Sequence, residues 1–122
     1  MLKSDAINKF IEYLNAEKKD CLAKAGELEN DTRRDEAIMA KIRANVYGIF
    51  VAVTQTSEKG DPDNPVGFIR EKFESIPEAW KESLAEAERH NDYVKTMNER
   101  VKLETLAAIS EKFENILRAS EA

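Results

Sequence analysis

All three prolines of this 122-residue chain lie between residues 62 and 77. Glycine is absent after Pro77, and the turn-forming stretch 58–64 contains both Gly60 and Pro62. Proline breaks or kinks a helix when it lies in the interior, and glycine weakens a helix, so this distribution permits long helices on both sides of residues 58–64. A fold of strands joined by tight turns needs glycine and proline at many more places, and it is not favoured.

Apolar residues recur three and four positions apart along most of the chain, the spacing of one helix face. This spacing predicts helices over about 4–28 and 33–57, a short helix after Pro65, and helical structure from Pro77 to Arg118. The apolar faces predict the core. Its expected members include Ile7, Phe10, Ile11, Leu14, Cys21, Leu22, Leu28, Ile38, Ile42, Val46, Ile49, Phe50, Val53, Trp80, Leu84, Val94, Met97, Val101, Leu106, Ile109 and Phe113.

Residues 58–64 form the predicted loop between an N-terminal helical hairpin and the C-terminal helices. Gly60 is expected to adopt a left-handed conformation there, and Asn64 is expected to cap a helix that has Pro65 at its first position. Further on, the stretch 75–78 has the pattern of a capping box, with Ser75 as the cap, which predicts a helix restart and a bend near Pro77.

The segment 77–118 is too long to match the first two helices, and the sequence allows two solutions. A break at His90-Asn91-Asp92 divides it, with Asn91 as the left-handed residue after one helix and Asp92 as the cap of the next. Alternatively, the segment stays one long helix whose excess length packs against a second copy. We therefore predict a single all-α domain over 1–122: an antiparallel bundle of about four helical units, the third bent near Pro77, with no strands.

Charge and cysteine content exclude several classes of protein. The formal net charge is −5; residues 1–60 carry ten basic and ten acidic side chains, and residues 61–122 carry nine and fourteen. Acidic residues flank the only adjacent basic pairs, so we expect no nucleic-acid binding and no binding to an anionic membrane surface. One cysteine excludes an intrachain disulfide, and the longest run without a polar side chain, 48–53, predicts no bilayer span. No secretory signal is visible, and a cytoplasmic location is expected.

Four polar residues interrupt the apolar faces: Lys18, Asn45, Asn91 and Asn98. If the first two helices turn near residue 31, Lys18 lies opposite position 44, so the polar residues are expected to meet in one layer at mid-bundle. Such a layer has two interpretations. It penalises wrong helix registers and wrong oligomers, or it forms a pocket for a small polar or anionic ligand with Lys18 as its charge.

His90 is the only histidine, and its sequence context argues against two known chemistries. The di-iron bundle pattern Glu-x-x-His is absent because Ala87 stands three residues earlier, so no metal is predicted. Phosphotransfer through His90 is a further hypothesis, disfavoured by the nearby carboxylate of Asp92. We interpret Cys21 as a structural thiol on an apolar helix face. We predict no cofactor, because no phosphate-binding glycine loop or calcium loop is present.

Two stretches resemble a set of small all-helical bacterial proteins of unknown function. They are residues 41–47 (KIRANVY) and the later pattern Ile76-Pro77…Trp80…Leu84…Ala87…His90-Asn91-Asp92. The resemblance covers most of the chain. It implies a bacterial cytosolic origin and carries no mechanism.

The function expected from these features is non-enzymatic. Amphipathic helices without a catalytic constellation indicate a helical bundle that acts through protein–protein contact, with itself as a homodimer or with another protein. The alternatives are a binder of a small polar or anionic ligand through the polar layer, and histidine phosphotransfer through His90.

Overall fold

The chain folds into helices joined by short connections. The computed structural model describes residues 2–121, with side chains from Ser4 onward. Its helices are α1 (Leu2–Asn30), α2 (Arg34–Gly60), α3 (Pro65–Ser75), α4 (Pro77–Arg89) and α5 (Tyr93–Glu121). Residues 2–121 contain no strand, so the predicted all-α bundle is confirmed, and α3 with α4 forms the third of its four units.

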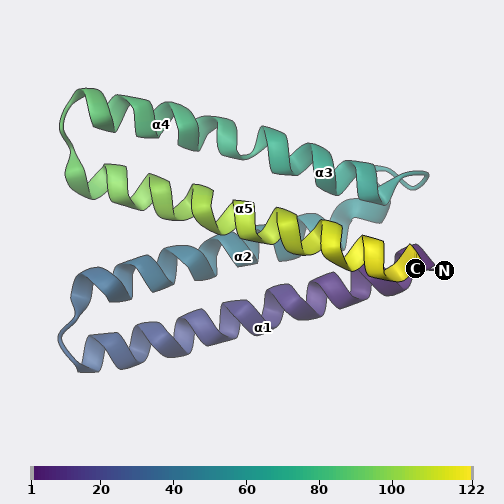
Figure 1. The fold of residues 1–122 in the computed structure, drawn as a ribbon, viewed down its shortest axis with the longest axis horizontal. Coiled ribbons are helices and arrows are strands. Elements are labelled where there is room, and N and C mark those ends of the chain that lie inside the picture. The colour runs from purple at the N-terminus through teal and green to yellow at the C-terminus, as the bar shows by residue number, and fades with distance from the viewer. Residues whose placement is uncertain (1, 122) are drawn as a thin grey trace.

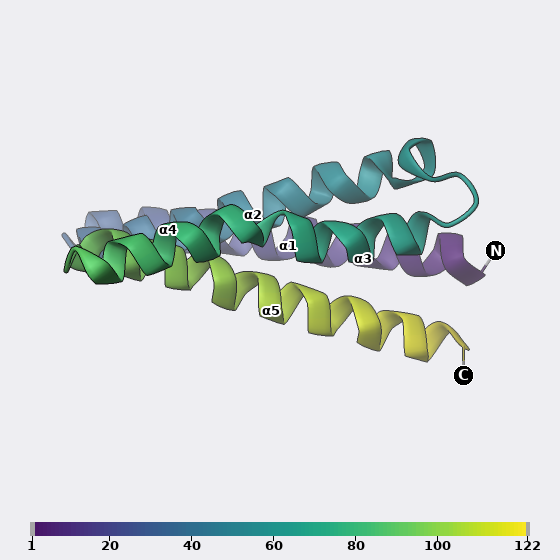
Figure 2. The ribbon, with the colours of Figure 1, turned by 90° about the horizontal axis from the view of Figure 1, so that it is seen from above.

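The helices form two hairpins, α1–α2 and α4–α5, whose turns lie at the same end of the molecule (Figure 1). We call this the open end; the closed end holds both termini and the connection from α2 to α3. At the closed end α1, α2, α3 and α5 surround the core. At the open end the hairpins lie side by side in nearly one layer, as the two perpendicular views show (Figures 1 and 2). Accordingly, α4 packs on α5, whereas α5 also packs on α1 and α2.

A cluster of phenylalanines fills the closed end. Phe113 of α5 lies with its ring centroid 4.7 Å from that of Phe10 in α1 and 5.5 Å from that of Phe73 in α3. Phe73 in turn lies 5.3 Å from Phe50 of α2. One aromatic cluster thus joins four helices. Large buried side chains such as these contribute strongly to stability.

Small side chains fill the seam between α1 and α2 near the open end. The buried cluster there consists of Ala25, Leu28, Ala37 and Ala40. Alanine lets two helices approach closely, but it is too short to reach a third helix across a gap. The α1–α2 hairpin is therefore tight at its tip, and its core residues there do not extend to α5.

The loop after α2 is shorter than predicted. Residues 58–60 belong to the last turn of α2, and the connection is 61–64. Pro62 keeps Asp61 out of the helical region of backbone dihedrals, and Asp61 has φ −150° and ψ 89°. Helix α2 therefore ends at Gly60. The prediction that Gly60 is left-handed is also wrong, because none of the glycines has a positive φ. Gly60 instead makes room for Phe68: a Cβ on Gly60 would lie 2.1 Å from Cε2 of that ring.

The predicted cap of α3 is confirmed, and the predicted capping box before α4 is wrong. Asn64 accepts a hydrogen bond from the backbone N–H of Gly67 (3.0 Å), with Pro65 beginning the helix. Ser75, however, belongs to α3, and Ile76 keeps helical dihedrals (φ −61°, ψ −43°). The chain therefore continues from α3 to α4 as one bent rod, because Pro77 removes a backbone donor without unwinding the residue before it.

A turn at residues 90–92 divides the C-terminal segment into two helices, as in the first of the two solutions that the sequence allows. Asn91 is left-handed (φ 55°), and the N–H of Asp92 donates to the carbonyl of Ala87 (2.9 Å). Asp92 then accepts a bond from the N–H of Lys95 (3.1 Å), capping α5. In the first hairpin, by contrast, Thr32 takes the left-handed position (φ 60°) and no side chain caps α2.

Helix α2 is long and apolar enough, by length and composition alone, to cross a membrane. The sequence prediction missed this because it required an unbroken apolar run, and the two charges Lys41 and Arg43 interrupt it. A helix at the centre of a helical bundle has the same composition. Within this fold α2 packs on α1, α3 and α5.

An ion pair between Arg70 of α3 and Glu114 of α5 gives stability a pH dependence. Two guanidinium nitrogens donate to the two carboxylate oxygens, at 2.9 and 2.6 Å, and this bonding lowers the pKa of Glu114 from its ordinary 4.5. A lowered pKa in the folded state contributes stability above the unfolded-state pKa that is lost as the pH falls through the folded-state value. Because both side chains are partly exposed, we expect Arg70→Ala to cost about 0.5 kcal/mol at pH 7 and progressively less as the pH falls below 4.5.

Urea unfolding at several pH values measures this effect. The matched control is Arg70→Ala in a Glu114→Gln background, where the cost should not vary with pH. A cost of Arg70→Ala that is equal at pH 7 and pH 2–3 would contradict the assignment.

Candidate functional site

The four polar residues expected to share one layer lie in different parts of the molecule. Asn45 is exposed on α2, where its neighbours Ala44 and Val46 are buried instead, and Asn91 is exposed in the α4–α5 turn. Lys18 is half-buried on α1, and Asn98 is half-buried near the start of α5. The predicted mid-bundle layer is therefore wrong: Asn91 is a turn residue, and Asn45 faces solvent.

Lys18 lies against α2 at Gly48. Its Nζ is 3.3 Å from the position that a Cβ on Gly48 would take. The predicted register placed residue 44 opposite Lys18. Helical side chains lean toward the N-terminus of their own helix, so in an antiparallel pair the long lysine reaches a later residue of α2. The missing side chain of Gly48 gives the lysine stem room, and the ammonium group stays within reach of solvent.

The residues considered for covalent chemistry lie in unsuitable surroundings. His90 is exposed and ends α4 through its backbone N–H, which donates to the carbonyl of Glu86. Cys21 is half-buried, and burial raises the pKa of its thiol, which disfavours the reactive thiolate. Burial likewise raises the pKa of Tyr13 and of Tyr47. Within residues 2–121 no three histidine, cysteine or carboxylate side chains gather as metal ligands would.

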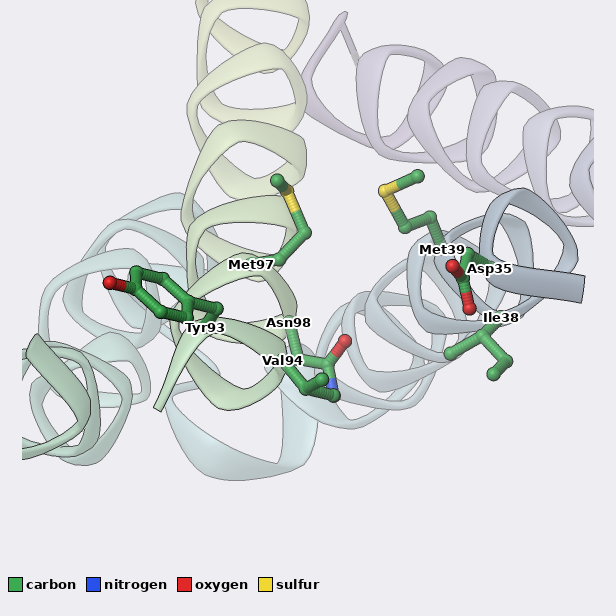
Figure 3. A pocket seen from close by; sticks show the side chains of 7 residues that line it. All are labelled: Asp35, Ile38, Met39, Tyr93, Val94, Met97 and Asn98. Carbon is green, nitrogen blue, oxygen red and sulfur yellow. The ribbon is translucent and has the colours of Figure 1, made fainter. Parts of the chain in front are cut away.

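The open end contains an apolar groove between α2 and α5, with a volume of about 270 Å³. Figure 3 shows Met39 of α2 and Met97 of α5 pointing to the same side of the gap, with Val94 and Ile38 below them on opposite sides of it. Tyr93 points away from α2. The lining residues are Asp35, Ile38, Met39, Tyr93, Val94, Met97 and Asn98. Of the four polar candidates from the sequence, Asn98 alone lies in this groove.

Several side chains predicted to be in the core are exposed, and most of them gather at this groove. Val94 is 73% exposed, and Met97 and Ile38 are each 48% exposed, beside Tyr93 at 79%. Leu22, on α1, and Ile49, farther along α2, are the other exposed members of the predicted core. The prediction fails here for one physical reason: the faces of α2 and α5 that meet in the core at the closed end continue to the open end, where the helices have diverged.

The chemistry of this groove is that of a binding surface. Asp35 and Asn98 are its polar lining residues apart from the Tyr93 hydroxyl, and the remaining side chains are aliphatic or thioether. Methionine is flexible and polarisable and adapts to partners of varied shape, and two of these lining residues are methionines. The groove can therefore bury an apolar surface, and it offers no nucleophile.

The sequence signal that would have identified this groove is the distribution of side-chain size. Alanines occupy the α1–α2 seam at the open end, whereas phenylalanines occupy the closed end. On the inner face of α1 beyond Leu14, Glu17 and Cys21 follow at i+3 and i+7, and both are only half-buried. Few large side chains are thus available to fill the space between the hairpins. No known protein family, curated protein or solved structure matches the chain.

Proposed function

We propose that this chain is a non-enzymatic helical-bundle protein that acts by binding another polypeptide in the groove at its open end. The observation that carries the proposal is the gathering of three exposed apolar side chains, Ile38, Val94 and Met97, on the walls of one groove. Single exposed apolar residues are ordinary on protein surfaces, whereas a contiguous apolar patch marks an interaction surface. Folding leaves about half of Ile38 and Met97 and most of Val94 exposed, and contact with a partner would bury this remaining apolar surface.

The shape of the groove favours a helical partner. Two helices form its walls, and their lining residues recur three and four apart: Asp35, Ile38 and Met39 on α2, and Val94, Met97 and Asn98 on α5. An amphipathic helix that lays its apolar face between two such walls presents residues at the same spacing. A small ligand would instead need several converging polar groups, and Asp35 and Asn98 are a sparse set.

The two other functions considered from the sequence have less support. A polar-ligand pocket needs Lys18 and Asn45 to line a common cavity, and neither residue lines the groove at the open end. Phosphotransfer needs a receptive site around His90, and this residue ends a helix beside the carboxylate of Asp92. We advance neither.

A photoreactive amino acid in place of Met97 tests the proposal in the organism that encodes the chain. Irradiation is expected to produce a covalent adduct with a protein, identified by mass spectrometry, because Met97 lies on the groove wall. The matched control is the same photoreactive group in place of Leu22, which is equally exposed (50%) but lies on α1 outside the groove lining. Equal labelling from both positions, or no adduct from position 97, would overturn the proposal.

A further inference from the structure

We propose that the partner in the groove is a second copy of this chain, bound through the same open end. This inference rests on the proposed function and names its partner. Three properties of the open end support it: the shape of the exposed face, the area it exposes, and its continuity with the core.

The shape is suited to pairing with itself. In a two-fold dimer the same patch meets its own copy, so a projection on one chain must find a hollow on the other. The open end carries both: Val94, which is 73% exposed, projects from the first turn of α5, and the groove toward α2 lies directly beside it. Each copy can therefore seat its α5 start beside the groove of the other, and the two contacts are equivalent.

The exposed area is of the size that a dimer needs. Ile38, Tyr93, Val94 and Met97 together expose on the order of 400 Å², judged from their exposed fractions and the areas typical of such side chains. That is about half of the roughly 800 Å² that each partner buries in an interface of standard size. The flanking helix surfaces of α2 and α5 supply the remainder, as the rim of an interface does.

The groove also continues the interior of the protein. Ile109 of α5 belongs to the core shared with α1 and α2, and Val101 is buried two turns before it. Met97 and Val94 follow one and two turns nearer the open end. A second copy whose apolar side chains enter the groove would lengthen this core. The methionines on both walls allow the side chains to adjust to one another.

The charges beside the groove do not oppose a second copy. The start of α2 carries Arg33, Arg34, Asp35 and Glu36, and the start of α5 carries Asp92 and Lys95. Each wall therefore begins with equal numbers of positive and negative charges, so two copies bring no net charge together at these helix starts.

Analytical ultracentrifugation of the purified full chain tests the inference. The chain is expected to sediment as a concentration-dependent dimer. Val94→Asp should weaken that dimer at least tenfold, because it places a carboxylate in a buried apolar contact. Ile38→Asp, on the opposite wall, should have the same effect. The matched control is Leu22→Asp, a change at an exposed leucine outside the groove lining, which should leave the dimer unchanged.

Circular dichroism must show unchanged helix content in each variant. Since Val94 is largely exposed and Ile38 is half-exposed, loss of folding is not expected, and Met97→Gln provides a milder substitution if either aspartate variant unfolds. A chain that stays monomeric up to about 1 mM overturns the inference. A dimer that resists both aspartate variants also overturns it, because the copies then associate elsewhere.

The failure of this inference can be distinguished from failure of the proposed function. If the purified chain is monomeric but position 97 forms adducts with a different protein, self-association is wrong and the binding function stands. If the chain is monomeric and position 97 forms no adduct, both are wrong. An adduct of twice the mass of one chain, together with the weakened Val94→Asp dimer, supports both.

Discussion

Phe113→Ala is expected to lower the free energy of unfolding by about 3–5 kcal/mol, the range for truncating a fully buried phenylalanine. Phe113 has no exposed surface, and its ring contacts Phe10 of α1 and Phe73 of α3. Its removal leaves a cavity at the place where the two hairpins are joined. Since the open end offers few compensating contacts between hairpins, the surrounding helices are held apart by their own packing and can collapse only partly into the cavity.

Urea unfolding followed by the fluorescence of Trp80, the single tryptophan, measures this loss, because Trp80 packs against the core. Leu22→Ala, at a half-exposed position on α1, is the control and should cost less than about 1 kcal/mol. A loss below that value for Phe113→Ala would show that the two hairpins are held together somewhere other than the aromatic cluster.

Glu99→Met is expected to change stability in the opposite direction, raising the free energy of unfolding by about 1–2 kcal/mol. Glu99 is only 6% exposed. Its Oε1 accepts a bond from the Lys102 ammonium group (3.1 Å), but its Oε2 is buried without a hydrogen-bond partner. A buried carboxylate that is only half satisfied costs more in lost hydration than its single ion pair returns.

Methionine matches the length of glutamate and removes this cost. Glu99 lies on the same face of α5 as Leu103 and Leu106, which border Phe73, Pro77 and Lys81 of the neighbouring rod, so an apolar side chain has partners there. Lys102 keeps contact with water after losing its partner. The matched control is Glu104→Met, an exposed site on the same helix that should change stability by no more than about 0.5 kcal/mol. A clear loss of stability for Glu99→Met would contradict the argument.

The helices and three of their ends could be predicted from local chemistry. The asparagine and aspartate at 91–92 end one helix and begin the next as their backbone preferences require, and Asn64 caps α3 for the same reason. These features depend on a few neighbouring residues. Ser75 has equally suitable local chemistry but no cap forms, because Ile76 already has helical dihedrals and its N–H is bonded to the carbonyl of Lys72.

The groove could not be predicted because it depends on how the hairpins lie relative to each other. Val94 and Met97 have the same spacing and composition as Val101 and Ile109, so a periodic pattern assigns all four to the core. Only the arrangement of the helices separates the buried pair from the exposed pair. Asn98 was singled out as a polar residue on an apolar face and does lie in the groove, although the layer proposed for it does not exist.

The two hairpins are long, and the aromatic cluster that joins them lies near one end only. Helix α2 has 27 residues, so the hairpin reaches about 40 Å from the closed end to its turn. With that lever arm, a rotation of about 5° between the hairpins moves one turn past the other by roughly 3.5 Å. A change in packing around Phe73 that rotated one hairpin against the other would therefore alter the width of a groove whose lining does not include Phe73.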